Sequence, residues 1–310
     1  MASALFDRDL VAIGDLSKKD IGEVLEHASK MLSIVEQGRR VDYLENEIMA
    51  TLFFEPSTRT RLSFESAMQR LGGGVIGFAD AGTTSTKKGE SLADTIEVVS
   101  SYADVIVIRH STEGAAREAA EHSKIPVINA GDGVGQHPTQ ALLDLFTIKK
   151  EKGRLDKLRI AMVGDMKNGR TVHSLSEALS LFGNEITFIA PEELQIPDSI
   201  YGRLSREYGS AQKSESLEKA RDADVIYMTR IQQERFAKPE DYKRFEHSFR
   251  IDRKFLEGAN NDVIIMHPLP RVMEISPEVD KMKNSVYFKQ ASYGVPVRMA
   301  ILDMMLTGKK

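Results

Sequence analysis

The chain has 310 residues, of which 41% are hydrophobic and 28% charged, a composition typical of a soluble globular protein with room for two domains. Its net charge of −4 does not favour nucleic-acid binding, and the lack of cysteine excludes disulfides, cysteine nucleophiles and thiolate metal ligands. The N-terminal residues do not resemble a signal peptide, and no apolar stretch reaches the roughly 18 residues of a membrane span. We therefore expect a cytoplasmic enzyme that does not bind membranes.

Short apolar segments alternate with helical patterns along almost the whole chain. The expected strands are residues 50–54, 104–108, 159–163, 185–189, 224–228 and 262–266. Because these segments are apolar on both faces, they are typical of a parallel sheet covered by helices. Apolar residues at helical spacing predict helices over residues 64–71, 142–149, 175–182 and 297–306.

This alternation predicts an α/β fold with two domains, each a mostly parallel sheet flanked by helices, joined by interdomain helices. The basic segment 149–157 separates the two series of strands. We place one domain at residues 1–148 and the other at residues 149–291. The C-terminal helix, within residues 292–310, is expected to pack back on the first domain.

Polar residues follow the first expected strand directly. Ser57, Thr58, Arg59 and Thr60 stand between this strand and the next helix. Ligands of open α/β sheets bind beyond the carboxyl ends of strands, and a helix N-terminus favours anions. The alternative is an ordinary helix cap formed by Ser57 or Thr58, with solvated arginines. The density of hydroxyl and guanidinium groups exceeds what a cap requires, and it favours a phosphate site.

A second junction follows Val127 and Ile128, where residues 129–136 are expected to form a flexible loop. His137 then precedes Pro138, which suits the first position of a helix. The positive helix end disfavours a charged imidazole and keeps a neutral N–H donor available. A capping histidine without a catalytic role explains the spacing equally well.

In the second half, three strand ends are followed by Arg170, Arg230 and Arg271. The polar segment 82–91 is either a solvated loop or a mobile lid that carries Lys87 or Lys88 to an anion. These cations suit a pair of substrates with several negative charges. Neither a serine nucleophile elbow nor a histidine-carboxylate cluster with metal spacing is present. We therefore expect direct transfer between bound substrates, driven by positioning and charge stabilisation.

Four motifs together resemble the aspartate and ornithine carbamoyltransferase family, in the family's order and at similar separations. They are S-T-R-T-R at residues 57–61, H-P-T-Q at 137–140, G-R-T-V-H-S-L at 169–175 and H-P-L-P-R at 267–271. The resemblance extends from about the N-terminus to the last helix. It implies that the carbamoyl group of carbamoyl phosphate is transferred to an amino acid, without a cofactor or a metal.

The resemblance also implies roles for the matching residues. Carbamoyl phosphate would be bound by Ser57, Thr58, Arg59, Thr60, Ser85, Lys88, Arg109, His137, Gln140, Pro268 and Leu269. Among these, Arg59, Thr60 and His137 would contact the carbonyl oxygen. Gln140 and the carbonyls of Pro268 and Leu269 would bind the carbamoyl NH₂. The amino acid would be bound by Lys88, Arg170, Thr171, Arg230 and Gln232, and the catalytic residues would be Arg59, Thr60, His137 and Lys88.

The second substrate is expected to be L-aspartate, in the committed step of de novo pyrimidine biosynthesis. The ornithine branch of the family has a cysteine where this chain has Pro268. Arg230 suits the second carboxylate of aspartate and would repel the ammonium group of ornithine. The alternatives are another amino acid, or a binding protein that has lost turnover. A dehydrogenase is disfavoured because the glycine fingerprint is missing.

The resemblance further implies a homotrimer in which Ser85 and Lys88 enter the active site of the neighbouring subunit. The lid is one residue shorter than the common family form, which leaves open whether Lys87 or Lys88 takes that role. Asn168 stands where the family has an aromatic residue. Zinc-containing regulatory chains, which form an allosteric holoenzyme, occur in the family, and the sequence leaves open whether one binds this chain.

Overall fold

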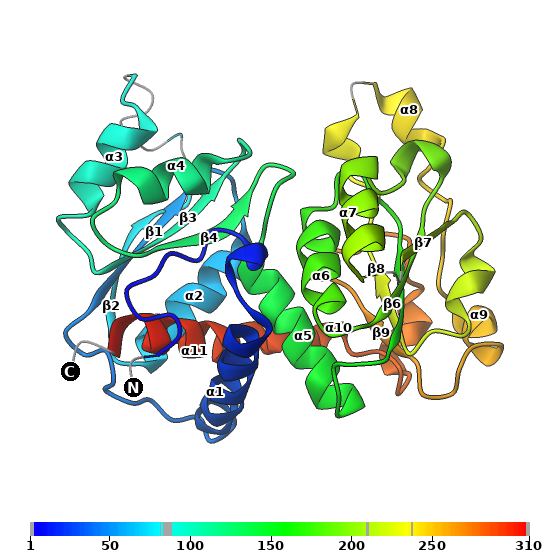
Figure 1. Cartoon of the computed structure of the whole chain (residues 1–310), viewed down its shortest axis with the longest axis horizontal. Helices are drawn as coiled ribbons and strands as arrows, with labels where there is room; N and C mark the ends of the chain where they lie inside the picture. Colours follow the sequence, from blue (N-terminus) through cyan, green and yellow to red (C-terminus); the bar gives the residue numbers. More distant parts are fainter. Residues whose placement is uncertain (1–2, 81, 83–88, 209–210, 237, 308–310) are drawn as a thin grey trace. The chain divides into compact units, whose positions relative to one another are not determined.

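The chain divides into two compact units in the computed structural model, which describes residues 3–80, 82, 89–208, 211–236 and 238–307 (Figure 1). Unit 1 contains Met1–Phe146 and Tyr293–Lys310, and unit 2 contains Thr147–Ser292. Each unit has its own parallel sheet with helices on both faces. No helix of the described ranges has the length and apolar character needed to span a membrane.

Unit 1 is built on a four-stranded sheet in which every pair of neighbouring strands is parallel. Its strands are β1 (Ile48–Phe53), β2 (Gly74–Phe78), β3 (Val105–His110) and β4 (Val127–Asp132). Its helices are α1 (Lys18–Glu36), α2 (Thr58–Arg70), α3 (Leu92–Val99), α4 (Ala115–His122), α5 (Pro138–Lys152, which continues into unit 2) and α11 (Gly294–Leu306), with a 3₁₀ turn η1 (Ile13–Asp15). Helices α3 and α4 lie on one face of the sheet, and α1, α2 and α11 lie on the other (Figure 1).

The strand order β2-β1-β3-β4 creates a topological switch point between β1 and β3. The chain leaves β1 for β2 on one side and returns to β3 on the other side. Crevices at such points are the usual ligand sites of open α/β sheets. The two strand ends meet there, because the N–H of Phe54 donates to the carbonyl oxygen of Arg109 at 2.9 Å.

Unit 2 repeats this plan with a five-stranded parallel sheet in the order β7-β6-β5-β8-β9. Its strands are β5 (Arg159–Val163), β6 (Glu185–Ile189), β7 (Ala211–Ser214), β8 (Val225–Met228) and β9 (Ile264–Met266). Its helices are α6 (Arg170–Ser180), α7 (Asp198–Tyr208), α8 (Pro239–Lys243), α9 (Arg253–Glu257) and α10 (Tyr287–Ser292), with 3₁₀ turns η4 (Glu192–Leu194), η5 (Leu217–Ala220), η6 (Gln233–Arg235) and η7 (Pro277–Lys281). The switch point of this sheet lies between β5 and β8.

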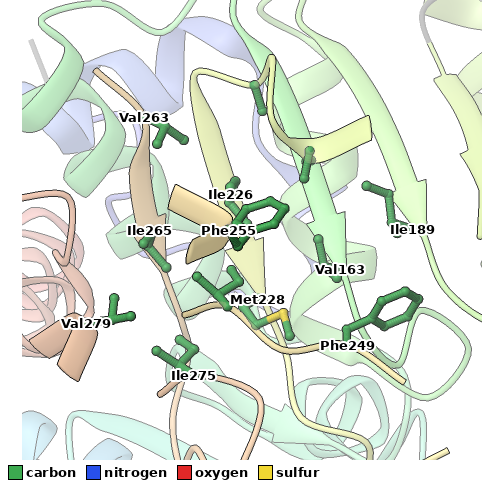
Figure 2. Close-up of a cluster of buried hydrophobic side chains, with 14 of the residues drawn as sticks. Val163, Ile189, Ile226, Met228, Phe249, Phe255, Val263, Ile265, Ile275 and Val279 are labelled. Atoms are coloured by element: carbon green, nitrogen blue, oxygen red, sulfur yellow. The ribbon is translucent and has the colours of Figure 1, made fainter. Parts of the chain in front are cut away.

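Alternate residues of the unit 2 strands form one hydrophobic core (Figure 2). Val163 of β5 and Met228 of β8 point into it, together with Phe255 of α9. Each is at most 6% exposed. Burial of a side chain of this size contributes about 1.5–3 kcal/mol. The core therefore holds β5 and β8 side by side, directly below the loops that follow them.

The structure confirms the predicted fold class, and the strands at residues 159–163 and 185–189 have the predicted bounds. Three edge strands, β2, β4 and β7, were not predicted, because their sequences are not apolar runs. Residues 129–132 of β4 (V-I-N-A-G-D) were expected to belong to a loop but form buried strand. Strand β2 (G-V-I-G-F) contains two glycines and is partly exposed, and β7 (A-Q-K-S) is largely polar. The predicted C-terminal helix is α11, which is buried almost all round against α1 and α2 within unit 1.

Candidate active site

The predicted phosphate loop forms the junction between β1 and α2. Ser57 is the N-cap of α2, but its side chain makes no capping hydrogen bond. Thr58 and Arg59 are exposed in the first turn, whereas Thr60 is only 7% exposed. The cap interpretation therefore does not explain Ser57. The helix N-terminus presents hydroxyl, guanidinium and backbone N–H groups at one place, which is the donor set that an anion requires.

Arg109 lies beside this junction, near the end of β3. Its Nη1 donates to the carbonyl oxygen of Ala130 at 3.1 Å, and its Nη2 forms an ion pair with Glu55. The side chain of Arg109 is 11% exposed and that of Glu55 is 25% exposed. The guanidinium group is therefore held at the edge of the sheet where β1 ends.

His137 and Gln140 lie at the junction between β4 and α5. The loop that connects β4 to His137 was expected to be flexible, but hydrogen bonds hold it together. Asp132 Oδ1 accepts hydrogen bonds from Asn129 Nδ2 at 3.0 Å and from the N–H of Gln136 at 2.9 Å, which tie the loop together. His137 is 3% exposed and directly precedes Pro138, the first residue of α5. Gln140 is partly buried, and its Nε2 donates to Asp144 Oδ1 at 2.9 Å.

In unit 2, the loop after β5 requires a glycine. Gly164 has φ +120, and a Cβ atom there would lie 2.1 Å from the carbonyl oxygen of Thr229. Asp165 is fully buried, and its Oδ1 accepts a hydrogen bond from the N–H of Asn168 at 2.9 Å. The backbone N–H of Asp165 donates to Thr229 Oγ1 at 3.2 Å. The loops after β5 and β8 are therefore joined closely. Arg170 is the first residue of α6 and follows this loop.

Two of the predicted aspartate ligands follow β8. Gln232 Nε2 donates to the carbonyl oxygen of Asn168 at 2.9 Å, so the residue that replaces the family's aromatic side chain contacts Gln232 through its backbone. Arg230 forms a bidentate pair with Glu234, with 2.9 Å between Nη1 and Oε2. This hydrogen bonding raises the pKa of Arg230 and lowers the pKa of Glu234. Arg230 also lines a pocket within unit 2, together with Tyr242.

The H-P-L-P-R segment follows β9 and is held by buried hydrogen bonds. His267 Nε2 lies 2.7 Å from Glu274 Oε1, and His267 Nδ1 accepts the N–H of Leu269 at 2.8 Å. Leu269 has φ +57, and its bond to Pro270 is cis. Arg271 pairs with Asp280 and donates to Tyr287 Oη at 3.0 Å. Arg271, which the sequence grouped with Arg170 and Arg230, is therefore engaged by residues of its own unit.

The structure thus places the predicted ligands in two groups. Unit 1 contains Ser57, Thr58, Arg59, Thr60, Arg109, His137 and Gln140, and unit 2 contains Arg170, Thr171, Arg230, Gln232, Pro268 and Leu269. Ser85, Lys87 and Lys88 lie outside the described residues. In the part of the chain that the structure describes, no group of three or more His, Asp or Glu side chains could hold a metal ion.

Sequence reasoning missed the acidic residues that orient these groups, namely Glu55, Asp144, Glu234 and Glu274. Asp144 lies four residues after Gln140 on the same side of α5, and Glu234 lies four residues after Arg230, which precedes the 3₁₀ turn η6. That spacing was the available signal for these two. Glu274 and Glu55 have no such signal, because tertiary structure brings them to their partners.

Both halves of the chain match domains of known proteins. Residues 8–150 match the carbamoyl-phosphate-binding domain of aspartate/ornithine carbamoyltransferases, and residues 156–305 match the aspartate/ornithine-binding domain. The aspartate carbamoyltransferase catalytic subunit of Thermococcus kodakarensis is 54% identical over 300 residues, which cover 96% of this chain and 97% of that protein. That of Methanopyrus kandleri is 52% identical and covers 99% of both chains.

Solved structures agree with these matches. The catalytic subunit of M. jannaschii aspartate transcarbamoylase is 52% identical with a TM-score of 0.88, and the alignment covers 96% of this chain and 97% of that one. The Trypanosoma cruzi enzyme in complex with carbamoyl phosphate and aspartate is 38% identical with a TM-score of 0.94, and it covers 98% of both chains. The chain belongs to the aspartate/ornithine carbamoyltransferase family. The relatives named here are all from its aspartate branch.

Proposed function

We propose that this chain transfers the carbamoyl group of carbamoyl phosphate to the amino group of L-aspartate. The products are N-carbamoyl-L-aspartate and phosphate, and the reaction is the committed step of de novo pyrimidine biosynthesis. The observation that carries this proposal is the full-length similarity to aspartate carbamoyltransferases, and the basic and polar side chains that follow the strands at each topological switch point support it. No step requires a cofactor.

Carbamoyl phosphate binds to the unit 1 group. The hydroxyl groups of Ser57 and Thr58 and the N-terminus of α2 hold the phosphate together with Arg109, which Glu55 and the Ala130 carbonyl keep in place. The carbonyl oxygen is bound by Arg59, Thr60 and His137. The almost complete burial of His137 supports this role, because a hydrogen bond is stronger away from water.

L-Aspartate binds to the unit 2 group. Arg170 and Thr171 at the start of α6 and Arg230 after β8 provide the positive charge and the hydroxyl group for its two carboxylates. Gln232 is oriented by its hydrogen bond to the Asn168 carbonyl. The carbonyls of Pro268 and Leu269 bind the carbamoyl NH₂, together with Gln140.

The chemical step is then a direct attack of the aspartate amine on the carbamoyl carbon. The negative charge that develops on the carbonyl oxygen is stabilised by His137, Arg59, Thr60 and the lid residue Lys88. The bond to the phosphate oxygen breaks, and the departing phosphate accepts the amine proton. The protein positions both substrates and supplies no base.

One assay tests the reaction and its substrate. The purified chain is mixed with carbamoyl phosphate and either L-aspartate or L-ornithine, and both phosphate and carbamoylated product are measured. We expect N-carbamoyl-L-aspartate and an equal amount of phosphate with aspartate only. Product with ornithine alone would reverse the substrate assignment, and binding of carbamoyl phosphate without product from either amine would indicate a binding protein.

The homotrimer with shared active sites remains part of the proposal. It rests on the family resemblance of Ser85 and Lys88, which lie in the lid. His137→Ala chains and Lys88→Ala chains should regain activity when they are mixed and allowed to exchange subunits. Some shared sites would then contain an intact His137 from one chain and an intact Lys88 from the other. If Lys87 is the lid residue instead, Lys87→Ala chains should be inactive alone and should complement His137→Ala chains, whereas Lys88→Ala chains should stay active alone. A monomer in sedimentation experiments would contradict the proposal.

A cytoplasmic location and a zinc-containing regulatory chain also stay predictions. The lack of cysteine is consistent with a reducing compartment. If a regulatory chain formed an allosteric holoenzyme, this chain would purify from its native source in a larger complex that contains zinc. Purification as the catalytic chain alone would contradict that part of the prediction.

A further inference from the structure

Gln140 is held in one orientation by an acidic residue beneath it. Its Nε2 donates to Oδ1 of Asp144 at 2.9 Å, one turn further along α5. Asp144 is fully buried, whereas Gln140 is partly exposed at the first turn of the helix. The contact therefore connects the candidate site with the interior of unit 1.

The chemistry of the two groups determines which end of the glutamine amide points to the interior. The two ends of a primary amide have nearly the same shape, but one donates hydrogen bonds and the other accepts them. An ionised carboxylate only accepts. Asp144 therefore binds the NH₂ end of Gln140, and the Oε1 end is directed elsewhere as an acceptor.

A buried arginine interacts electrostatically with Asp144. Arg298 of α11 is 3% exposed. Burial lowers its pKa to about 9, against the opposing influence of Asp144, so the guanidinium group remains charged at neutral pH. The mutual attraction of the two charges stabilises the carboxylate form of Asp144 in a place where it would otherwise be costly.

Arg298 also supports both helices that open the site. Its Nη1 donates to Ser63 Oγ at 2.7 Å, and Ser63 Oγ donates in turn to the carbonyl oxygen of Arg59 at 2.7 Å. Its guanidinium carbon lies 4.8 Å from the centre of the Phe64 ring. On the α5 side, Nη2 lies 3.5 Å from Thr139 Oγ1. One side chain of α11 thus contacts the second turn of α2 and the first turn of α5.

We propose that Asp144, supported by Arg298, is a positioning residue that presents the Oε1 acceptor of Gln140 to the substrate and thereby selects a carbamoyl over an acyl phosphate. This inference rests on the proposed role of Gln140 in binding the carbamoyl NH₂. An acetyl group has a methyl in place of the NH₂, and it would leave the oriented Oε1 without a donor. Such mismatches discriminate strongly because the polar group loses its hydrogen bond.

Two stable analogues test this selection without turnover. Phosphonoacetamide carries the NH₂ group, and 2-oxopropylphosphonate carries a methyl group in its place. Their dissociation constants, and that of inorganic phosphate, are measured by calorimetry on the full chain. The unmodified chain should prefer the amide by about tenfold or more, as one lost hydrogen bond implies. In Asp144→Asn the preference should fall to about twofold, because an asparagine binds either end of Gln140, whereas phosphate affinity should change less than about twofold.

A second variant tests the same inference in case Asp144→Asn does not fold. Asp144→Asn/Arg298→Met removes both buried charges, and such replacements are often tolerated. It should show the same loss of preference. Asp303→Asn is the matched control: Asp303 is a buried acid of unit 1 that pairs with His27 at 2.6 Å, and this variant should keep the full preference.

Three results would overturn the inference. Full preference for the amide in both Asp144 variants would show that Asp144 does not orient Gln140. Loss of preference in Asp303→Asn as well would indicate a general packing effect. Equal affinity of the unmodified chain for the two analogues would overturn the role of Gln140 itself. The proposed reaction would still stand in all three cases if N-carbamoyl-L-aspartate forms, so the two failures are distinguishable.

Discussion

His267 and Glu274 form a buried pair in unit 2, with 2.7 Å between Nε2 and Oε1. The same imidazole accepts the N–H of Leu269 through Nδ1, which makes Nε2 the donor to Glu274. Glu274 Oε2 accepts the backbone N–H groups of Val272 at 3.1 Å and Met273 at 2.9 Å. The pair therefore holds the backbone on both sides of Pro270, next to the carbonyls that are proposed to bind the carbamoyl NH₂.

Glu274→Gln should destabilise unit 2 in a pH-dependent way. Burial would raise the pKa of Glu274, but the hydrogen bonds from His267 and from the backbone N–H groups outweigh it, so the pKa is lowered. A lowered carboxyl pKa stabilises the folded state above the unfolded value near 4.5, and this contribution disappears as pH falls below that value. We expect a loss of about 1–2 kcal/mol at pH 7 that shrinks toward pH 4. Thermal unfolding of both proteins across this range measures it, and a difference that is independent of pH would contradict the prediction.

His137→Ala should lower turnover far more than it weakens carbamoyl phosphate binding. An oxyanion donor acts mainly in the transition state, and its removal commonly costs about 10²–10³ in rate. Steady-state kinetics with a separate measurement of carbamoyl phosphate affinity checks this. His122→Ala, which changes an exposed histidine at the end of α4, is the control and should keep normal turnover. Unchanged turnover in His137→Ala would leave His137 as a helix-capping residue.

Arg230→Lys should raise the KM for aspartate by about 10–100-fold, with carbamoyl phosphate affinity unchanged. A lysine keeps the charge but cannot bind a carboxylate with two parallel hydrogen bonds, as Arg230 binds Glu234. Saturation kinetics in aspartate at fixed carbamoyl phosphate tests this. The control is Arg244→Lys, in which an exposed arginine of unit 2 that pairs with Glu193 is changed. Equal KM values for aspartate in Arg230→Lys and in the control would show that Arg230 does not bind aspartate.

Gly164→Ala and Gly183→Ala should differ strongly in stability, although both glycines have positive φ. At Gly183, φ is +68 and a Cβ would meet nothing within 4 Å, so alanine should cost about 1 kcal/mol of backbone strain. At Gly164, the added Cβ would also lie 2.1 Å from the Thr229 carbonyl oxygen, which should raise the cost above about 3 kcal/mol. Melting temperatures of the two variants decide this. Similar values would mean that β5 and β8 can separate without cost.

The sequence alone was sufficient to predict the alternation of strands and helices in the fold. Short, mainly apolar runs produced the correct bounds of β5 (R-I-A-M-V) and β6 (E-I-T-F-I), because a strand covered on both faces is apolar at most of its positions. Edge strands such as β7 escape this rule, since they are covered on fewer sides and tolerate polar residues. The four motifs likewise located the candidate ligands, because local chain geometry places residues after a strand at the sheet edge.

Only the tertiary structure decided how those ligands are oriented. Arg298 reaches Ser63 across 235 residues of sequence, and Glu274 reaches His267 through a turn that no periodic pattern marks. Arg230 and Arg271 both follow strands, but Glu234 pairs with Arg230, whereas Asp280 and Tyr287 contact Arg271. The physical reason is the range of the interactions. Helix spacing and strand ends follow from neighbours along the chain, whereas the partner of a buried charge depends on which distant side chains share its low-dielectric surroundings.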